Sequence, residues 1–156
     1  MIWEILMPGN GHERWMELAL EEARRASDEN EIPVGAVLVQ NGELVAVEHN
    51  RTRQHSDPLA HAEKLLIDKI LSQKIKYLSD YSLYVTLEPC LMCAGMMIWS
   101  RLGALIFGAP DPKAGAVGSV YNVLADRAFN HHPAVVRGVL AEQCGGLLRD
   151  FFQDKR

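Results

Sequence analysis

The chain has 156 residues, 48% hydrophobic and 23% charged, which is the balance of an ordinary globular protein and the length of one domain. No apolar run approaches the ~20 residues of a membrane span, so a membrane partner is not expected. The net charge of −4 argues against a broad basic surface for nucleic acid, although an acidic chain can carry a local basic patch. Three cysteines are too few for a disulfide framework.

The N-terminus gives no indication of secretion. Residues 1–7 lack the basic start and the length of a secretory signal, and Met7 could be the true start, which would make residues 1–6 an extension. We therefore expect a single domain over residues 1–156, located in the cytoplasm.

The hydrophobic pattern predicts helices and strands along the whole chain. In chain order we expect a helix over 13–30, strands over 34–39 and 44–47 joined by an Asn41-Gly42 hairpin, a helix over 61–72, a strand over 83–87, a helix over 91–100, a strand over 104–107, a Gly-rich loop over 111–118, a strand over 135–140 and a helix over 142–153. This order predicts an α/β fold, a three-layer α/β/α sandwich around one mixed five-stranded sheet. Gly95 is expected to allow close packing of its helix.

Two short motifs carry metal-binding side chains. His61 and Glu63 stand two residues apart, and Cys90 and Cys93 stand three apart after Pro89. Cys90 and Cys93 would face the same side of a helix, at an N-terminus whose free N–H groups stabilise thiolates. A redox dithiol or half of a four-cysteine structural site uses the same spacing, but the chain has no second Cys-x-x-Cys pair. Three protein ligands leave one tetrahedral position open, which is typical of a catalytic zinc site.

The spacing of His61 and Glu63 predicts where the helix must begin. Residues two apart lie about 200° apart around a helix, so they cannot converge on one metal from its interior. His61 must therefore precede the helix, and Asp57-Pro58 supplies a break upstream. Two thiolates neutralise the formal charge of zinc, so a base is needed to take the proton of the attacking water. Glu63 can be that base if burial raises its pKa.

These motifs resemble those of the zinc-dependent nucleobase and nucleoside deaminases, which carry His-x-Glu followed by Pro-Cys-x-x-Cys. Within that superfamily the chain is similar to the bacterial tRNA-specific adenosine deaminases in the stretches 32–39, 57–63, 84–98, 100–103, 107–109, 111–113 and 118–119. The resemblance runs from about residue 12 to residue 152. The zinc motifs identify only the superfamily, and the 111–119 loop is the more specific part.

The resemblance implies a cytidine deaminase-like fold, one Zn²⁺ per subunit, and hydrolytic conversion of adenosine to inosine at the wobble position of a tRNA anticodon. It also implies a homodimer whose partner subunit helps to form the surface for the anticodon stem-loop. Carried over by position, Asn50 would hydrogen-bond the flipped base, and Asp111 and Lys113 would contact ribose and phosphate. Pro58 and Ala62 would line the base pocket.

Two other functions remain open at this point. A deaminase of a free base or nucleotide (guanine, cytosine or a deoxynucleotide) would share every zinc-site residue, and only the 111–119 loop favours the RNA enzyme. A non-catalytic, zinc-stabilised RNA-binding subunit would have no need of the proton shuttle at Glu63. Trp15 and Trp99 could stack on bases, but their helical settings favour packing in the core or at a dimer interface.

Overall fold

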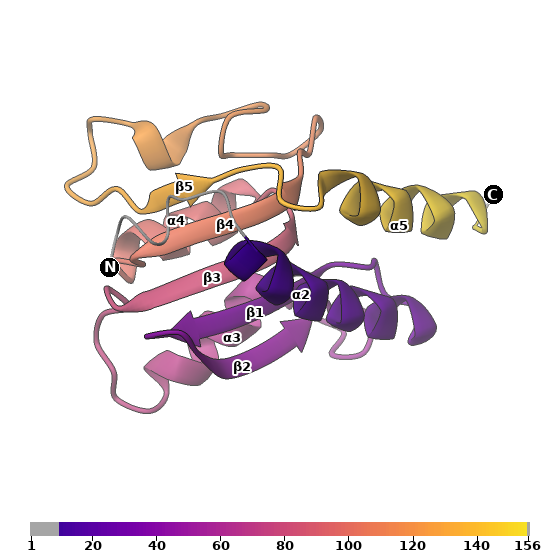
Figure 1. The fold of residues 1–156 in the computed structure, drawn as a ribbon, viewed down its shortest axis with the longest axis horizontal. Coiled ribbons are helices and arrows are strands. Elements are labelled where there is room, and N and C mark those ends of the chain that lie inside the picture. Colours follow the sequence, from indigo (N-terminus) through magenta and orange to yellow (C-terminus); the bar gives the residue numbers. More distant parts are fainter. Residues whose placement is uncertain (1–9, 156) are drawn as a thin grey trace.

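The structure is a computed structural model that describes residues 10–155, so the expected extension over residues 1–6 lies outside the described part. Its elements are α2 (Asn10–Asp28), β1 (Gly35–Gln40), β2 (Glu43–His49), α3 (Ala62–Leu71), β3 (Tyr81–Leu87), α4 (Leu91–Trp99), β4 (Ala104–Ala109), the 3-10 helix η1 (Val123–Ala125), β5 (Ala134–Val136) and α5 (Ala141–Gln153) (Figure 1). No helix among residues 10–155 is both long and apolar enough to cross a membrane.

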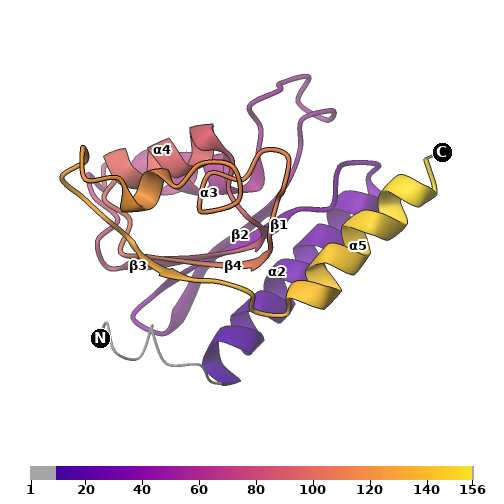
Figure 2. The ribbon, with the colours of Figure 1, turned by 90° about the horizontal axis from the view of Figure 1, so that it is seen from above.

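The sheet has the strand order β2-β1-β3-β4-β5. β1 is antiparallel to both β2 and β3, whereas β3, β4 and β5 run parallel. A parallel pair needs a crossover, and α4 supplies the one between β3 and β4. Figure 2 shows α3 and α4 on one face of the sheet and α2 and α5 on the other. The predicted three-layer sandwich with a mixed five-stranded sheet is therefore confirmed.

The core has two halves because the strands alternate their side chains between the two faces. On β1, Ala36 and Leu38 pack against the α3 and α4 layer, whereas Val37 and Val39 pack against the α2 and α5 layer. α2 and β1 approach each other closely at Gly35, where an added Cβ would lie 2.0 Å from the backbone oxygen of Ala19. Glycine is required there because no side chain fits between helix and strand.

The Asn41-Gly42 hairpin is confirmed. Asn41 has φ 51° and Gly42 has φ 75°, so both central residues adopt the left-handed conformation of the turn that joins twisted antiparallel strands. This turn sets the β1–β2 register that pairs Gln40 with Glu43.

Three expectations differ from the structure. The strand expected over 135–140 ends at residue 136, because Gly138 (φ 81°) and Leu140 (φ 51°) turn the backbone out of the extended conformation. Gly95 does not mediate close packing, since an added Cβ there would meet nothing within 4 Å among the described residues. The first helix also begins and ends earlier than predicted, and the left-handed Asn30 (φ 61°) follows its end.

Candidate active site

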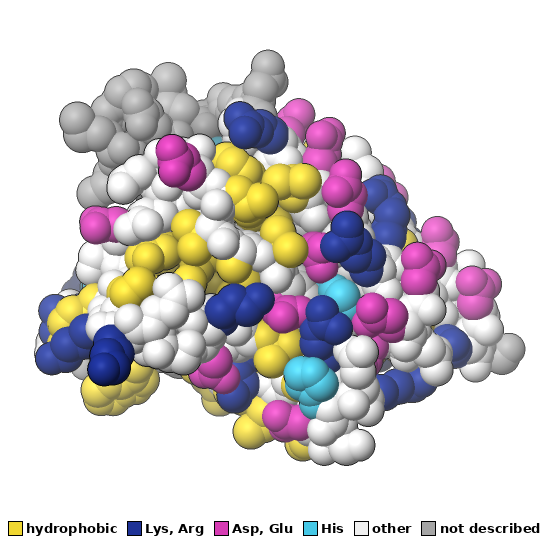
Figure 3. Space-filling view, turned by 90° about the horizontal axis from the view of Figure 1, so that it is seen from below, with side chains coloured by type: hydrophobic (Ala, Val, Ile, Leu, Met, Phe, Trp, Pro, Cys, Tyr) yellow, Lys and Arg dark blue, Asp and Glu magenta, His cyan; other side chains and the backbone are white. Residues whose placement is uncertain are grey.

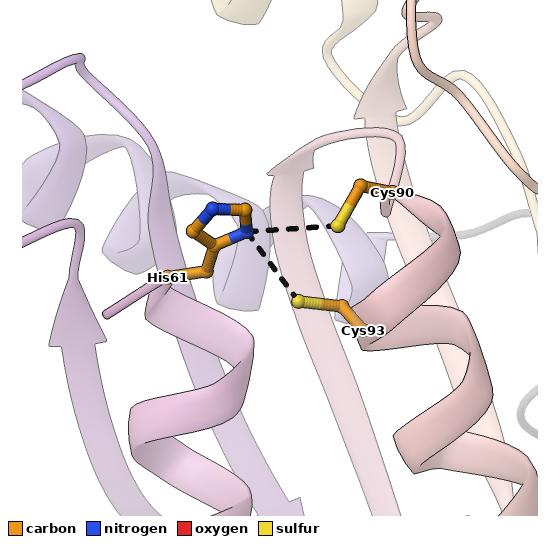
Figure 4. Close-up of side chains that lie close together, drawn as sticks. All are labelled: His61, Cys90 and Cys93. Carbon is orange, nitrogen blue, oxygen red and sulfur yellow. Dashed lines mark hydrogen bonds between the residues drawn. The ribbon is translucent and has the colours of Figure 1, made fainter. Parts of the chain in front are cut away.

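Three predicted metal ligands converge where α3 and α4 begin (Figure 4). His61 precedes α3 with extended backbone angles (φ −76°, ψ 150°), as the spacing argument requires. Cys90 holds the corresponding position before α4 (φ −75°, ψ 174°), and Cys93 lies in the first turn of that helix. α3 follows β2 and α4 follows β3 in the chain, and the two helices lie side by side on the same face of the sheet (Figure 2).

The spacing of the ligand atoms fits zinc. His61 Nδ1 lies 3.6 Å from Cys90 Sγ and 3.7 Å from Cys93 Sγ, and all three atoms lie within 4.8 Å of one another. Zinc bonds of about 2.05 Å to nitrogen and 2.3 Å to sulfur, at a tetrahedral angle, place those atoms about 3.6 Å apart. The donor set of one imidazole and two thiols is also of the type that zinc prefers.

The electrostatics of the cluster favour a thiolate. The Cys93 thiol, together with the His61 ring, lowers the pKa of Cys90 to about 4, so Cys90 is ionised at neutral pH. The same contact with Cys90 raises the pKa of Cys93. Cys93 therefore keeps a proton that a bound metal would displace.

The ring of His61 presents Nδ1 to both cysteines. The Cys90 sulfur is the largest cause of a raised pKa at His61, and the charge of Glu63 acts in the same direction. Since Nδ1 faces the two sulfurs, it is the ring nitrogen that a metal held between them would bind.

Glu63 lies in the first turn of α3, 4% exposed, beside the metal-binding cluster. Burial raises the pKa of its carboxyl group, and the Cys93 side chain is among the groups in contact with it. A carboxyl group whose pKa is raised toward neutrality can both accept and return a proton. The environment of Glu63 is therefore the one that a proton shuttle needs.

The remaining predicted residues lie in different settings. Asn50 directly follows β2, is 6% exposed, and donates its backbone N–H to the carbonyl of Val34 (3.0 Å). Ala62 is fully buried in the core on the α3 side, and Pro58 is exposed on the preceding loop. Asp111 is half-buried and its Oδ1 accepts the Lys113 backbone N–H (3.0 Å), while the Lys113 side chain is exposed.

Glu88 is a structural residue of the site that the sequence reasoning did not single out. It is 3% exposed at the end of β3, and its two carboxylate oxygens accept the backbone N–H groups of Asp111 (3.2 Å), Val117 (3.0 Å) and Ser119 (3.2 Å) as well as the Ser119 hydroxyl. A Cβ on Gly115 would lie 2.2 Å from this carboxylate. Glu88 therefore holds the 111–119 loop against the strand that leads to Cys90.

Glu31 has the same role on the other side of the site and was also missed. It is 1% exposed and accepts the backbone N–H groups of Arg53 (2.9 Å) and Gln54 (2.8 Å). This carboxylate fixes the loop between Asn50 and His61. A charged residue next to a buried strand is the sequence signal for such an anchor, because a buried carboxylate needs donors.

A groove of about 650 Å³ lies beside the carboxyl ends of β3 and β4. Its lining is formed by the last residues of these strands, the start of the 111–119 loop and α5, and it includes Leu87, Ala109, Asp111, Lys113, Arg149 and Phe152. The groove thus combines an apolar floor with two basic side chains and one acidic side chain.

Comparison with known proteins agrees with this geometry. Residues 10–109 match the family described as the cytidine and deoxycytidylate deaminase zinc-binding region. The chain belongs to this deaminase family. It is 46% identical to a tRNA-specific adenosine deaminase of Bacillus subtilis over 92% of this chain and 90% of the relative. It is 42% identical to the protein of the same description in Aquifex aeolicus, over 94% and 97%.

Solved structures of deaminases share the fold. One, from a study of A-to-I editing by tRNA:A34 deaminases, is 41% identical with a TM-score of 0.82 and covers 86% of this chain and 99% of that one. A guanine deaminase from Nitrosomonas europaea is 25% identical with a TM-score of 0.74, over 93% and 85%. The resemblance to the tRNA-specific adenosine deaminases is confirmed, and the His61, Cys90 and Cys93 cluster belongs to a zinc-dependent deaminase.

Proposed function

We propose that this deaminase converts adenosine to inosine at the wobble position of a tRNA anticodon, consuming one water and releasing ammonia. The observation that carries the proposal is the buried carboxyl of Glu63 beside three side chains spaced for zinc. His61, Cys90 and Cys93 would hold one Zn²⁺ per subunit. When bound, the zinc polarises the water that attacks the ring.

The residues of the chain itself then perform the proton transfers and the binding. Glu63 takes one proton from the attacking water and delivers it to the ring nitrogen, and it then carries the proton of the added hydroxyl to the amino group, which leaves as ammonia. The Asn50 amide, which can both donate and accept, binds the edge of the flipped base. Pro58 and Ala62 line the base pocket. The base of a loop nucleotide is already unpaired, so turning it outward costs little.

The RNA backbone would follow the groove beside β4. Lys113 and Arg149 place two positive charges there on a chain of net charge −4, and Phe152, 47% exposed, offers an aromatic face. Asp111 and Lys113 would contact ribose and phosphate. Asp111 lines the same groove and Glu142 pairs with Arg149 (2.7 Å), so the groove offers few positive charges, which is compatible with phosphate contacts that are few.

We also propose that the chain, as one domain over residues 1–156, acts in the cytoplasm as a homodimer. The support is an apolar face on α4 that no residue among 10–155 covers, where Leu91 is 53% exposed, Trp99 is 81% exposed, and Gly95 lies open between them at i+4 spacing. This setting agrees with the expectation that Trp99 packs at an interface. Sedimentation of the Trp99→Glu variant should show a monomer where the wild type shows a dimer.

The activity test uses the wild type, Glu63→Gln and the matched control Glu17→Gln, an exposed glutamate of α2. Each protein is incubated with bacterial tRNA, and A-to-G changes at the wobble position are read after reverse transcription. We expect conversion by the wild type and the control, and a rate lower by about 10²–10⁴-fold for Glu63→Gln with zinc retained. Wild-type activity in Glu63→Gln would remove Glu63 from the mechanism.

A free-base deaminase is the second candidate, favoured by the fold shared with the guanine deaminase at a TM-score of 0.74. Ammonia release from guanine, cytosine or a deoxynucleotide, with no change in tRNA, would replace the main proposal with this one. Binding of tRNA with no reaction on any of these substrates would indicate a non-catalytic subunit.

A further inference from the structure

A buried histidine next to Asn50 is held between two carboxylates. His49, 2% exposed at the end of β2, places Nδ1 2.8 Å from Glu22 Oε2 and Nε2 2.7 Å from Glu29 Oε2. Each ring nitrogen therefore faces a carboxylate oxygen, and between two ionised carboxylates both nitrogens would donate. The ring links α2 and the residue that follows it to the end of β2.

His49 is the centre of a chain of acidic and basic side chains. The further ion pairs are Arg25 with Glu22 (2.8 Å), Arg51 with Glu29 (3.7 Å), Arg51 with Glu48 (2.7 Å) and Lys69 with Glu48 (3.8 Å). These pairs join α2, β2 and α3. Acidic and basic side chains intermix over the face of the molecule shown in Figure 3. Each buried charge in the network has a partner, as burial of ions requires.

The network holds both sequence neighbours of Asn50. Glu29 contacts His49 on one side of Asn50 and Arg51 on the other. The Arg51 backbone N–H also donates to the carbonyl of Ala60 (3.0 Å), one residue before the metal ligand His61. The segment between β2 and α3 is therefore tied to α2 by side chains and to the zinc site by the backbone.

The Asn50 side chain itself is left available to a ligand. Successive residues of an extended chain point to opposite faces, so with His49 toward α2, Asn50 points toward the side of the sheet that carries α3 and α4. Among the residues that the structure describes, none forms a hydrogen bond with the side-chain amide of Asn50, whose backbone N–H donates to Val34. Its orientation must therefore be set by its neighbours and not by a partner of its own.

We propose that His49, held as an imidazolium between Glu22 and Glu29, is a positioning residue that fixes Asn50 for binding of the substrate base. This inference rests on the proposed function, in which Asn50 contacts the base. If either carboxylate loses its charge, the ring nitrogen that faces it either keeps a proton with no anionic acceptor or gives that proton up. The hydrogen bond between His49 and that side chain, which holds the end of β2 to α2 and the residue after it, is then weakened. The zinc ligands lie on other elements, so metal binding is preserved.

The test compares Glu22→Gln with Glu21→Gln, the same change at the adjacent, exposed residue of α2. Zinc-loaded proteins are assayed by steady-state deamination of an anticodon stem-loop RNA. We expect the KM of Glu22→Gln to rise about tenfold with kcat within about threefold of the wild type, the pattern of lost substrate binding. Glu21→Gln should match the wild type. If Glu22→Gln does not fold, Glu29→Gln serves instead, because the Glu29 side chain is 41% exposed.

A spectroscopic readout tests the same proposal without turnover. In ¹H–¹⁵N spectra of the wild type at pH 7.5, both ring nitrogens of His49 should carry a proton, and His49→Gln assigns the signals. The proposal is overturned if only one nitrogen is protonated, if Glu22→Gln and Glu21→Gln behave alike, or if kcat falls while KM is unchanged. A wild type that leaves the RNA unchanged overturns the proposed function first, and the role of Asn50 with it.

Discussion

The substitution Glu88→Gln tests whether one buried carboxylate holds the 111–119 loop. Gln keeps only one of the two acceptor oxygens, so at least one backbone donor loses its partner: the N–H of Asp111 at one oxygen, or those of Val117 and Ser119 at the other. An orphaned donor costs about 1–3 kcal/mol, and each bond that remains weakens by about 1 kcal/mol when its acceptor becomes neutral. Removal of the buried charge offsets part of this loss, which leaves a cost of about 3 kcal/mol.

For a domain of this size, about 3 kcal/mol corresponds to a fall in Tm of about 6–12 °C. Thermal unfolding of the zinc-loaded protein measures the fall, and zinc content is determined in parallel to exclude loss of metal. Glu43→Gln, an exposed glutamate of β2, is the control and should shift Tm by about 1 °C or less. If Glu88→Gln with a full complement of zinc melts within about 2 °C of that control, the loop is not held by this carboxylate.

Three further predictions use other parts of the structure. Gly115→Ala, whose Cβ would lie 2.2 Å from Glu88 Oε2, should lower Tm by about 4 °C or more and reduce kcat/KM on RNA, measured on the same samples. Burial raises the pKa of Tyr84 to about 12, above its unfolded value near 10, so this residue stabilises the fold below pH 10 and loses that effect as pH rises toward 12. Denaturant unfolding should therefore show Tyr84→Phe gaining on the wild type above pH 10 and not below pH 9. Chelation of zinc should abolish deamination and lower Tm, both restored by added zinc.

The metal ligands could be predicted because the relevant geometry is local. The spacing of His61 and Glu63 is incompatible with a helix interior, and the structure confirms that His61 precedes α3 in extended conformation. The positions of Cys90 and Cys93 follow in the same way from the start of α4. The catalytic role of Glu63 and the substrate contacts of Asn50 stay predictions that the experiments above would test.

The anchors of the two loops could not be predicted, because their partners are distant in the sequence. Glu88 binds backbone groups 23 to 31 residues away, and Glu31 binds groups 22 and 23 residues away. Such contacts depend on how each loop returns to the sheet, which residue spacing does not show. The final strand was predicted too long because the hydrophobic pattern carries no information on backbone angles. Apolar residues continue past Val136, but Gly138 and Leu140 adopt left-handed angles that end the strand.

These anchors indicate how one zinc site can serve different bases. The metal ligands and Glu63 lie in the first turns of α3 and α4 or directly before them, so their geometry follows from the two helices and the sheet. The segments that would meet the rest of the substrate, residues 50–60 and 111–119, are irregular, and each is fixed by a single buried carboxylate that binds backbone N–H groups. Backbone donors are present whatever the side chain, so the exposed residues of these loops can change while Glu31 and Glu88 keep the loops in place. Exposed loop residues can therefore vary without disturbing the metal-binding cluster, and under the proposed function the choice of base would be set by the loops and the reaction chemistry by the helix starts.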